Sequence, residues 1–259
     1  MTSWEFPGSD PIDILIDIPA GSIAVSAEPT TVTTVGVRRS GHGGQGDPEV
    51  QVSFAQGRLE IIQPTPPSFL RGHAGVELTV KVPPGSRCTV RSASADVSCV
   101  GELAGLQAKT ASGDVTAASV SGPLAVTTAS GDVWLETGGA AVEVRTASGD
   151  ISLRAAAGDV SLHTASGDIQ LGTATASVLA NTASGDVHIG SVAGGQTRVK
   201  TVSGDTAIGV AAGASIYLDL SSITGRIKNQ LAETDGSAEV GLRVTCRSVS
   251  GDIQIARAQ

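Results

Sequence analysis

Acidic residues at a fixed spacing are the side chains in this sequence that could do chemistry. The pentapeptide TASGD occurs five times, first at Thr110 and last at Thr182, and the variants TVSGD and SVSGD follow at Thr201 and Ser248. The first six Asp residues of the series lie 18 residues apart. The complete series is Asp96, Asp114, Asp132, Asp150, Asp168, Asp186, Asp205 and Asp252.

Carboxylates repeated so regularly could form a column, and such a column could have either of two roles. At a strand spacing of ~4.8 Å, adjacent carboxylates repel by roughly 1 kcal/mol in water and by about 3 to 4 kcal/mol at a surface-like dielectric constant. Asp could offset this by accepting backbone N–H groups in an Asx turn, helped by the Ser before Gly. Alternatively, the column could bind cations, as in the calcium-loaded β-roll with its G-G-x-G-x-D repeat. TASGD lacks the second Gly-rich half of that repeat, so we predict a structural turn column without a cofactor.

The histidines and cysteines have no spacing typical of a metal or catalytic site. There is no H-x-x-x-H or Cys/His pattern and no G-x-S-x-G elbow. An odd number of widely spaced cysteines indicates buried or free thiols in a reducing compartment. We therefore predict a protein that is not an enzyme, with a β-helical enzyme acting on polysaccharides as the alternative. The residues concerned are His42, His73, His163, His188, Cys88, Cys99 and Cys246.

The period of 18 residues predicts the elements that position the Asp column. Each period contains two nine-residue halves in which apolar residues alternate, as in Ile151, Leu153 and then Val160, Leu162. Such a half predicts a short strand with one buried face, and Gly before Asp predicts a corner where a positive φ is tolerated. Stacked coils would pair equivalent strands in parallel register. The predicted inward columns are Val115, Val133, Ile151, Ile169, Val187 and Ala117, Leu135, Leu153, Leu171, Ile189.

The predicted outward positions carry mixed side chains, among them one tryptophan. Trp134 lies between Val133 and Leu135, so alternation directs it outward, followed by Ser152, Gln170 and His188 one coil apart. An exposed Trp is a frequent interface anchor, and we predict Trp134 as a partner contact. The alternative is that a neighbouring coil or loop covers it. A second outward column holds Lys109, Thr127, Arg145, His163 and Asn181.

The chain divides into a segment without the motif and a repeat region. Residues 1–85 are rich in alternating apolar segments and predict either irregular opening coils or a small β cap, whereas 86–259 is the solenoid region. The two are expected to form one continuous structural unit. Residues 228–241 depart from the pattern and are interpreted as an insertion that covers the open end. The fold class is thus all-β, a parallel β-solenoid with 18-residue coils, right-handed by the general rule for parallel crossovers.

Composition and charge exclude several partners. The 259 residues have a net charge of -8, and no basic run exceeds the pair Arg38 and Arg39, so nucleic-acid binding is not expected. Asp13 and Asp17 interrupt the first apolar run and no basic start precedes it, so neither a signal peptide nor a transmembrane segment is predicted. We expect a cytoplasmic protein, with the cell surface reached by a non-classical route as the alternative.

The order of these segments is similar to that of a known family. IPAGSIAV, a Gly-rich loop, GRLEII, VELTVKVPPGSRCTV and then repeated TASGDV resemble the DUF4097 group of bacterial β-strand-repeat proteins, related to Toastrack domains and labelled "putative adhesin". The likeness extends from about Ile12 to Ile255. It implies a parallel β-helix-like fold and a binding or scaffolding role, and it implies no catalytic residues. We therefore expect a scaffold or adhesin-like protein that presents a rigid surface to a protein or cell-envelope partner.

Overall fold

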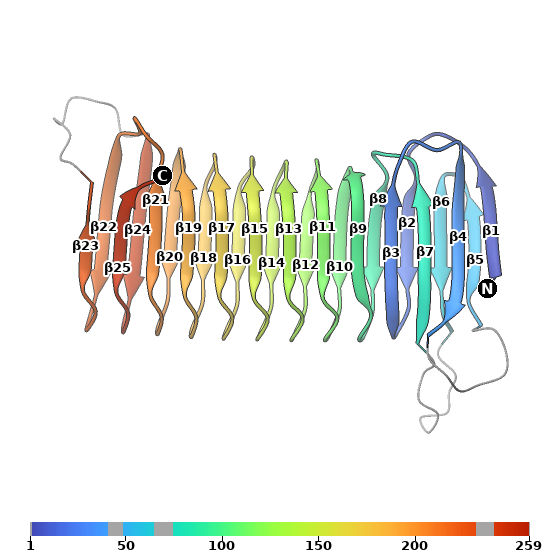
Figure 1. Ribbon diagram of the computed structural model, residues 1–259, viewed down its shortest axis with the longest axis horizontal. Helices are drawn as coiled ribbons and strands as arrows, with labels where there is room; N and C mark the ends of the chain where they lie inside the picture. Colours follow the sequence, from blue (N-terminus) through green and yellow to red (C-terminus); the bar gives the residue numbers. More distant parts are fainter. Residues whose placement is uncertain (1, 41–48, 65–74, 232–240, 259) are drawn as a thin grey trace, which may run out of the picture. The chain divides into compact units, whose positions relative to one another are not determined.

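All the regular elements of the described residues are β-strands (Figure 1). The computed structural model describes residues 2–40, 49–64, 75–231 and 241–258. They form two compact units, Met1–Asp132 and Val133–Gln259, and each unit contains strands of two sheets, which we call A and B. Within these residues, no helix has the length and apolar character required to cross a bilayer. The predicted all-β class is confirmed.

The first unit combines parallel coils with antiparallel additions at one side. β4 pairs antiparallel with β1 and β7, and β5 pairs antiparallel with β6. The remaining pairings are parallel. Sheet A follows the order β1 (Thr2–Pro7), β4 (Val32–Arg39), β7 (Val76–Val82), β3 (Gly21–Ala27), β9 (Asp96–Leu103) and β11 (Val115–Val120). Sheet B follows the order β12 (Leu124–Thr127), β10 (Gly105–Lys109), β8 (Arg87–Arg91), β2 (Asp13–Asp17), β6 (Arg58–Ile62) and β5 (Gln51–Ala55).

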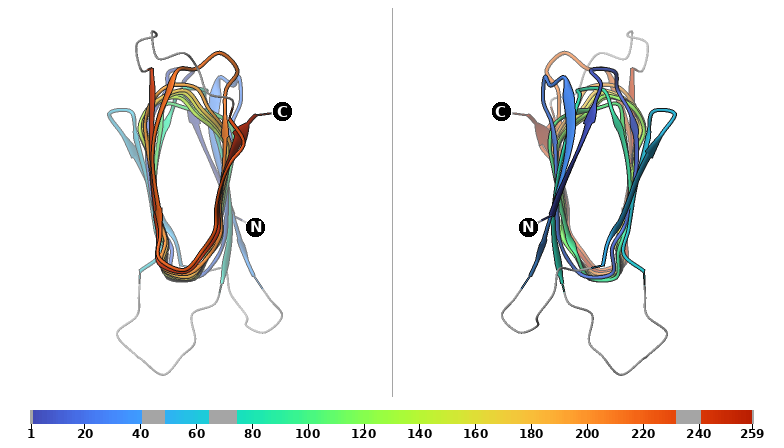
Figure 2. Two further views of the ribbon diagram at one scale, coloured as in Figure 1. Left: turned by 90° about the vertical axis from the view of Figure 1, so that its left-hand side faces the viewer. Right: turned by 90° about the vertical axis from the view of Figure 1, so that its right-hand side faces the viewer.

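The second unit is parallel throughout its described pairings. Successive strands alternate between the two sheets, and Figure 2 shows the sheets of a coil facing each other. Sheet A follows the order β13 (Val133–Gly138), β15 (Ile151–Ala156), β17 (Ile169–Ala174), β19 (Val187–Val192), β21 (Thr206–Val210), β25 (Ile253–Arg257) and β23 (Ile227–Asn229). Sheet B follows the order β14 (Val142–Arg145), β16 (Val160–His163), β18 (Val178–Asn181), β20 (Gly195–Lys200), β24 (Leu242–Ser248) and β22 (Ile216–Ser222).

The register within the sheets confirms the predicted coil of 18 residues. Val133 pairs with Ile151, Ile151 with Ile169 and Ile169 with Val187. Val133, Ile151 and Ile169 are completely buried. Because neighbouring coils place similar aliphatic side chains on top of one another, the core is a set of Val, Ile and Leu columns between the two sheets.

The order of the coils in space differs from their order in the sequence. The last strand, β25, lies between β21 and β23, so the final repeat pairs with both neighbours and is not the outermost coil. In the first unit, β7 similarly fills the position between β3 and β4, which both precede it in the chain. At both places the chain passes over one coil position and returns to fill it. The predicted insertion at 228–241 falls largely on 232–240, outside the described residues.

The predicted boundary at residue 85 stays a prediction. Strands on its two sides pair directly, since β2 pairs with β8 and β3 with β9. The two compact units instead divide between Asp132 and Val133.

Candidate functional site

One outward row on sheet A of the second unit combines an exposed aromatic residue with uncharged polar residues. Register places these residues opposite one another on successive strands, and alternation with buried neighbours directs them away from the core. Hydrogen bonds to the neighbouring strands hold every strand of the row, so the backbone positions of these side chains are fixed. We call this set the outer row, and it consists of Trp134, Ser152, Gln170, His188, Ala207 and Gln254.

Trp134 is the large apolar residue of the outer row, and it is exposed. Its side chain is 62% exposed, so no neighbouring coil or loop covers it. Two residues further along the same strand, Glu136 approaches Arg154 of β15 at 3.8 Å, so a charged pair lies on the same face as the indole. Its role as a partner contact stays a prediction, because exposure alone identifies no partner.

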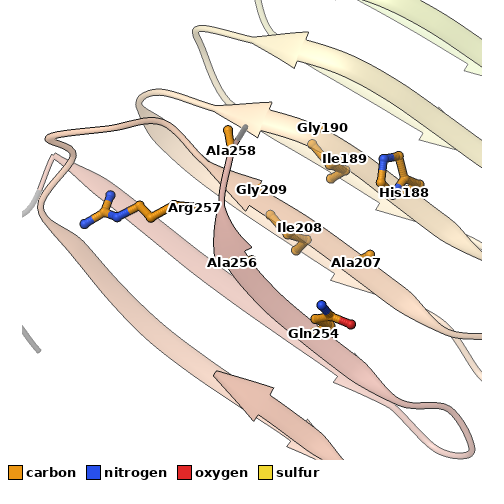
Figure 3. Close-up of a pocket in the computed structure, with 10 residues that line it drawn as sticks. All are labelled: His188, Ile189, Gly190, Ala207, Ile208, Gly209, Gln254, Ala256, Arg257 and Ala258. Carbon is orange, nitrogen blue, oxygen red and sulfur yellow. The ribbon is translucent and has the colours of Figure 1, made fainter. Parts of the chain in front are cut away.

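A groove of about 350 Å³ crosses the other end of the outer row (Figure 3). His188 and Gln254 form its sides, and Ala207, the short residue between them, leaves the space open. The floor beside it is formed by Gly190, Gly209 and Ala256.

A close approach of backbones explains the glycines of that floor. A Cβ atom on Gly209 would lie 1.8 Å from the carbonyl oxygen of Gly190, and one on Gly190 would lie 2.7 Å from that of Gly172. These contacts are shorter than any van der Waals separation, so larger residues would force the strands apart. The stripe of glycines was visible in the sequence at intervals of 18 and 19, but the alternation pattern did not single it out.

A second groove of about 400 Å³ joins the outer row to the Asp column. It is lined by His188 and Gln254 on one side and by three carboxylates of consecutive coils on the other, with Lys228 nearby. The carboxylates belong to Asp186, Asp205 and Asp252.

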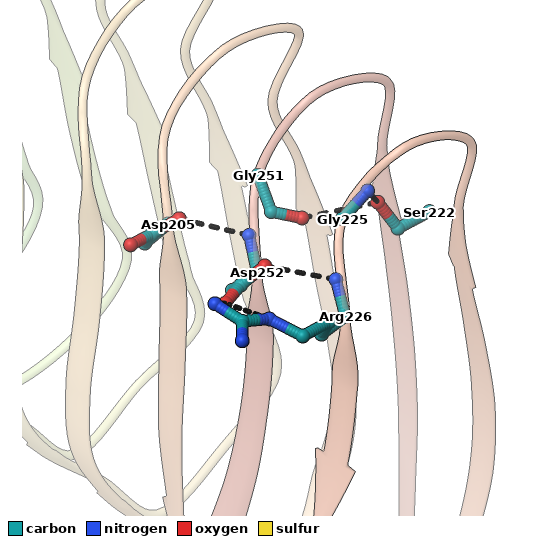
Figure 4. Close-up of polar contacts among 6 residues, drawn as sticks. All are labelled: Asp205, Ser222, Gly225, Arg226, Gly251 and Asp252. Atoms are coloured by element: carbon teal, nitrogen blue, oxygen red, sulfur yellow. Dashed lines mark hydrogen bonds and ion pairs between the residues drawn. The ribbon is translucent and has the colours of Figure 1, made fainter.

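The Asp column forms a ladder of hydrogen bonds between coils rather than within turns. Within each unit, the backbone N–H of one Asp donates to Oδ1 of the Asp in a neighbouring coil, and in the second unit the ladder ends where the N–H of Arg226 donates to Asp252 at 2.8 Å (Figure 4). Bonds to a charged acceptor are stronger than neutral ones and offset repulsion along the column. The donor–acceptor pairs are Asp114–Asp96 (3.1 Å), Asp132–Asp114 (2.9 Å), Asp168–Asp150 (2.8 Å), Asp186–Asp168 (2.8 Å), Asp205–Asp186 (2.7 Å) and Asp252–Asp205 (2.8 Å).

The local turn bond expected from Asp and Ser is made by the first residue of the pentapeptide. The N–H of Gly167 donates to Oγ1 of Thr164 at 3.0 Å, and the corners at Thr110, Thr128 and Thr146 repeat this bond. At the fifth TASGD corner the N–H of Gly185 donates to the carbonyl of Ser203 instead. Thr164 is buried, whereas Ser166 is exposed. Thr therefore closes the corner, and Asp links one corner to the next.

The freedom of glycine to adopt a positive φ is used at one SGD corner. Of these glycines only Gly204 has a positive φ, of 142°. The others are required because a Cβ would collide with the neighbouring coil: on Gly167 it would lie 2.0 Å from the carbonyl oxygen of Gly149.

Charges at the end of the ladder are paired. The guanidinium of Arg226 approaches Oδ2 of Asp252 at 3.2 Å. The backbone N–H of Arg226 lowers the pKa of Asp252, and the guanidinium adds to this effect. Arg226 occupies the Asp position of the degenerate corner SITGR, a substitution that the sequence displayed but that gained meaning only from the coil order.

Among the histidines and cysteines of the described ranges, His188 lines the two grooves, and the others lie apart from them. His163 lies on sheet B, where Ser161 and Asn181 contact its two ring nitrogens at 2.9 and 3.2 Å. Burial and then Arg145 lower its pKa. Over the described ranges, no group of three or more His, Cys, Asp or Glu could hold a metal ion. His42 and His73 lie outside the described residues.

The three cysteines are buried free thiols. The hydrogen bond of the Cys88 thiol with Cys99, and then burial, raise the pKa of Cys88. Burial raises the pKa of Cys246 to about 12. Thiols of this kind pack as small apolar groups rather than react as nucleophiles.

Comparisons with known proteins identify one family and several similar solved structures. No curated protein matches the chain. Among solved structures, a "putative adhesin" from Bacteroides fragilis is 13% identical, with 98% of this chain and 96% of that chain covered and a TM-score of 0.40. A "putative lipid binding protein" from Parabacteroides distasonis is 14% identical, with 99% and 96% covered and a TM-score of 0.44. A "putative adhesin" from the latter organism is 12% identical, with 98% and 96% covered and a TM-score of 0.38.

A family model described as Toastrack DUF4097 matches residues 14–256. This match includes the antiparallel strands β4 and β5 of the first unit as well as the regular coils of both units. The chain therefore belongs to the Toastrack DUF4097 family.

Proposed function

We propose that this protein is a non-enzymatic, adhesin-like binding protein that contacts a macromolecular partner through the outer row of its second unit. The observation that carries the proposal is Trp134, a large aromatic side chain that is 62% exposed on a strand fixed by its neighbours. Trp is costly to leave in water and is enriched among the residues that dominate binding energy.

The shape of the outer row favours an extended partner. The row crosses the strands at steps of ~4.8 Å, from Trp134 through Gln170 to the groove between His188 and Gln254. Amide, imidazole and hydroxyl groups along it can donate and accept hydrogen bonds without carrying a fixed charge. An extended protein segment or a cell-envelope polymer could bind along this face. The scaffold would lose little conformational entropy on binding, because its strands are already ordered.

Recovery of the partner from native cells tests the proposal. Wild type and Trp134→Ala would be used as bait against soluble and envelope fractions, with Val100→Ala as the matched control, because Val100 is 58% exposed but lies in the first unit. We expect one partner whose recovery falls at least about tenfold with Trp134→Ala and is unchanged with Val100→Ala. Equal recovery with all three baits, or no partner in any fraction, would contradict the proposal.

The second groove favours one other candidate, an enzyme acting on polysaccharides. Asp186, Asp205 and Asp252 converge there from three coils, as an acid-dependent mechanism would require. Their Oδ1 atoms are already engaged by backbone N–H groups of neighbouring coils, which favours a structural role. A panel of polysaccharides assayed with wild type and Asp205→Asn separates the two: turnover lost in a folded Asp205→Asn protein would support the enzyme.

A further inference from the structure

Four basic side chains gather on two neighbouring strands of sheet B in the second unit. Arg198 and Lys200 belong to β20, Arg243 and Arg247 belong to β24, and all four are exposed. The parallel register places Lys200 directly opposite Arg247. We call these four residues the basic cluster.

The basic cluster is poorly compensated within the chain. β20 and β24 contain no acidic residue. Asp219 approaches Arg247 at 4.0 Å, and the guanidinium of Arg243 stacks over the ring of Tyr217 at 4.7 Å. In the described part of the chain no carboxylate pairs with Arg198 or Lys200. Like charges on directly opposite residues destabilise a sheet, so folding gains nothing from this arrangement.

An apolar ridge follows directly after the same strands. At the second position of the corner pentapeptide, earlier coils have Ala, whereas the last three coils have Val202, Val249 and Ile223. Their exposed fractions are 53%, 43% and 74%. They come from adjacent corners, since the N–H of Ser250 donates to the carbonyl of Val202 and that of Thr224 to the carbonyl of Val249. We call these three residues the apolar ridge.

Figure 4 shows the three corners that carry the apolar ridge side by side, with Asp205, Asp252 and Arg226 on the side of sheet A. The acids there are engaged: Asp252 pairs with Arg226, and Oδ1 of Asp205 accepts the N–H of Asp252. On the side of sheet B, Lys200 and Arg247 lie two residues before Val202 and Val249. The combined surface therefore presents branched aliphatic tips flanked by positive charge that Asp219 compensates only in part.

We propose that the basic cluster and the apolar ridge together form a docking surface for an anionic lipid membrane. Peripheral membrane binding combines apolar side chains that enter the boundary between headgroups and acyl chains with Lys and Arg that attract anionic lipid. Charge complementarity selects an anionic surface, and the exposed aliphatic ridge selects lipid over a soluble polyanion. Nucleic acid fits less well, because the guanidinium of Arg243 already stacks over the ring of Tyr217, where a base would otherwise stack. This surface is separate from the outer row on sheet A.

Flotation with phosphatidylcholine vesicles, with and without phosphatidylglycerol, tests the proposal on the full chain. We expect wild type to float only with phosphatidylglycerol vesicles. The double variant Lys200→Glu/Arg247→Glu should bind about tenfold less or weaker still, and Val202→Ala/Val249→Ala should also lose most of the binding. Trp134→Ala should float as wild type does, which keeps this proposal distinguishable from the function of the outer row.

The chain offers a matched control for charge alone. Arg91 and Lys109 form the equivalent opposite pair in the first unit, but Ala93 and Ala111 follow them in place of the apolar ridge. Arg91→Glu/Lys109→Glu should therefore float as wild type does, with circular dichroism melting used to verify the fold of every variant. The proposal is overturned if wild type ignores phosphatidylglycerol, if this control loses binding equally, or if Val202→Ala/Val249→Ala binds normally. Concentration-dependent dimerisation that the ridge variant abolishes would instead assign the surface to a second copy.

Discussion

Arg226 takes the place of an aspartate directly beside Asp252, and it both donates its N–H to the carboxylate and pairs with it through the guanidinium. The ladder of acidic side chains in the second unit thus ends on a basic residue. These contacts lower the pKa of Asp252. At pH values between the native pKa and the ordinary one, this carboxyl therefore binds fewer protons in the folded state than in the unfolded chain. The resulting stabilisation is present above the ordinary carboxyl pKa of about 3.9 and is lost as the pH falls through the lower native value.

Arg226→Asp would place another carboxylate at the end of this ladder. We expect its melting temperature to lie below that of wild type at neutral pH, and the difference to shrink as the pH is lowered below about 4, where carboxylates become protonated. Arg226→Lys keeps the charge and should change little. Thermal melts across this range check the sign, and a difference that grows on acidification would contradict it.

Thr164 should stabilise the corner through the N–H of Gly167. Thr164→Val preserves the shape but removes the acceptor, so this N–H loses its bond and stability should fall by about 1 to 3 kcal/mol. Urea unfolding measures the change. Ser166→Ala, at an exposed position of the same corner, should stay within about 0.5 kcal/mol. If Ser166→Ala destabilised the protein more than Thr164→Val, Ser and not Thr would be the residue that makes the local turn bond.

Gly167 should tolerate no Cβ atom, because that atom would lie 2.0 Å from the carbonyl oxygen of Gly149. Relief requires the ladder between two coils to open, so Gly167→Ala should cost about 3 kcal/mol or more, at the upper end of single substitutions. Gly241→Ala is the control, because its nearest neighbour would be 4.0 Å away. Chemical denaturation of both distinguishes this clash from the general cost of replacing glycine.

The inward and outward faces of one strand pair should respond differently to truncation. Leu153 is 1% exposed, and Leu153→Ala leaves a cavity in the column, which should cost about 2 to 5 kcal/mol. Trp134→Ala removes a larger side chain, but from an exposed position, and should change stability by no more than about 0.5 kcal/mol. Equal losses in a denaturation experiment would show that the alternation has been assigned to the wrong face.

The sequence predicted the coil because residues such as Val133, Ile151 and Ile169 carry the same burial requirement at a constant spacing. Periodicity fixes which residues of neighbouring coils are opposite, but not which coils are neighbours. The corners at Ile223 and Val249 have compatible registers, so their exchanged order could not be inferred. Lys200 and Arg247 are separated by an interval outside the 18-residue period, and for that reason their proximity was not apparent. The alternation did predict the exposed position of Trp134, and the groove beside Gln254 depended again on the exchanged coils.

The buried cysteines should be unreactive for as long as the protein is folded. A thiolate is the reactive form of cysteine, and burial raises the pKa of Cys246 to about 12, so almost none is present at pH values near 8. The pKa of Cys88 is raised as well, through its contact with Cys99. A thiol reagent at this pH should therefore label native protein only at the rate of unfolding and should label all three cysteines in urea. Ser166→Cys, which places a thiol at an exposed corner, should react at once. Wild-type labelling as fast as that of this variant would show that the core opens locally at the coils that hold these residues.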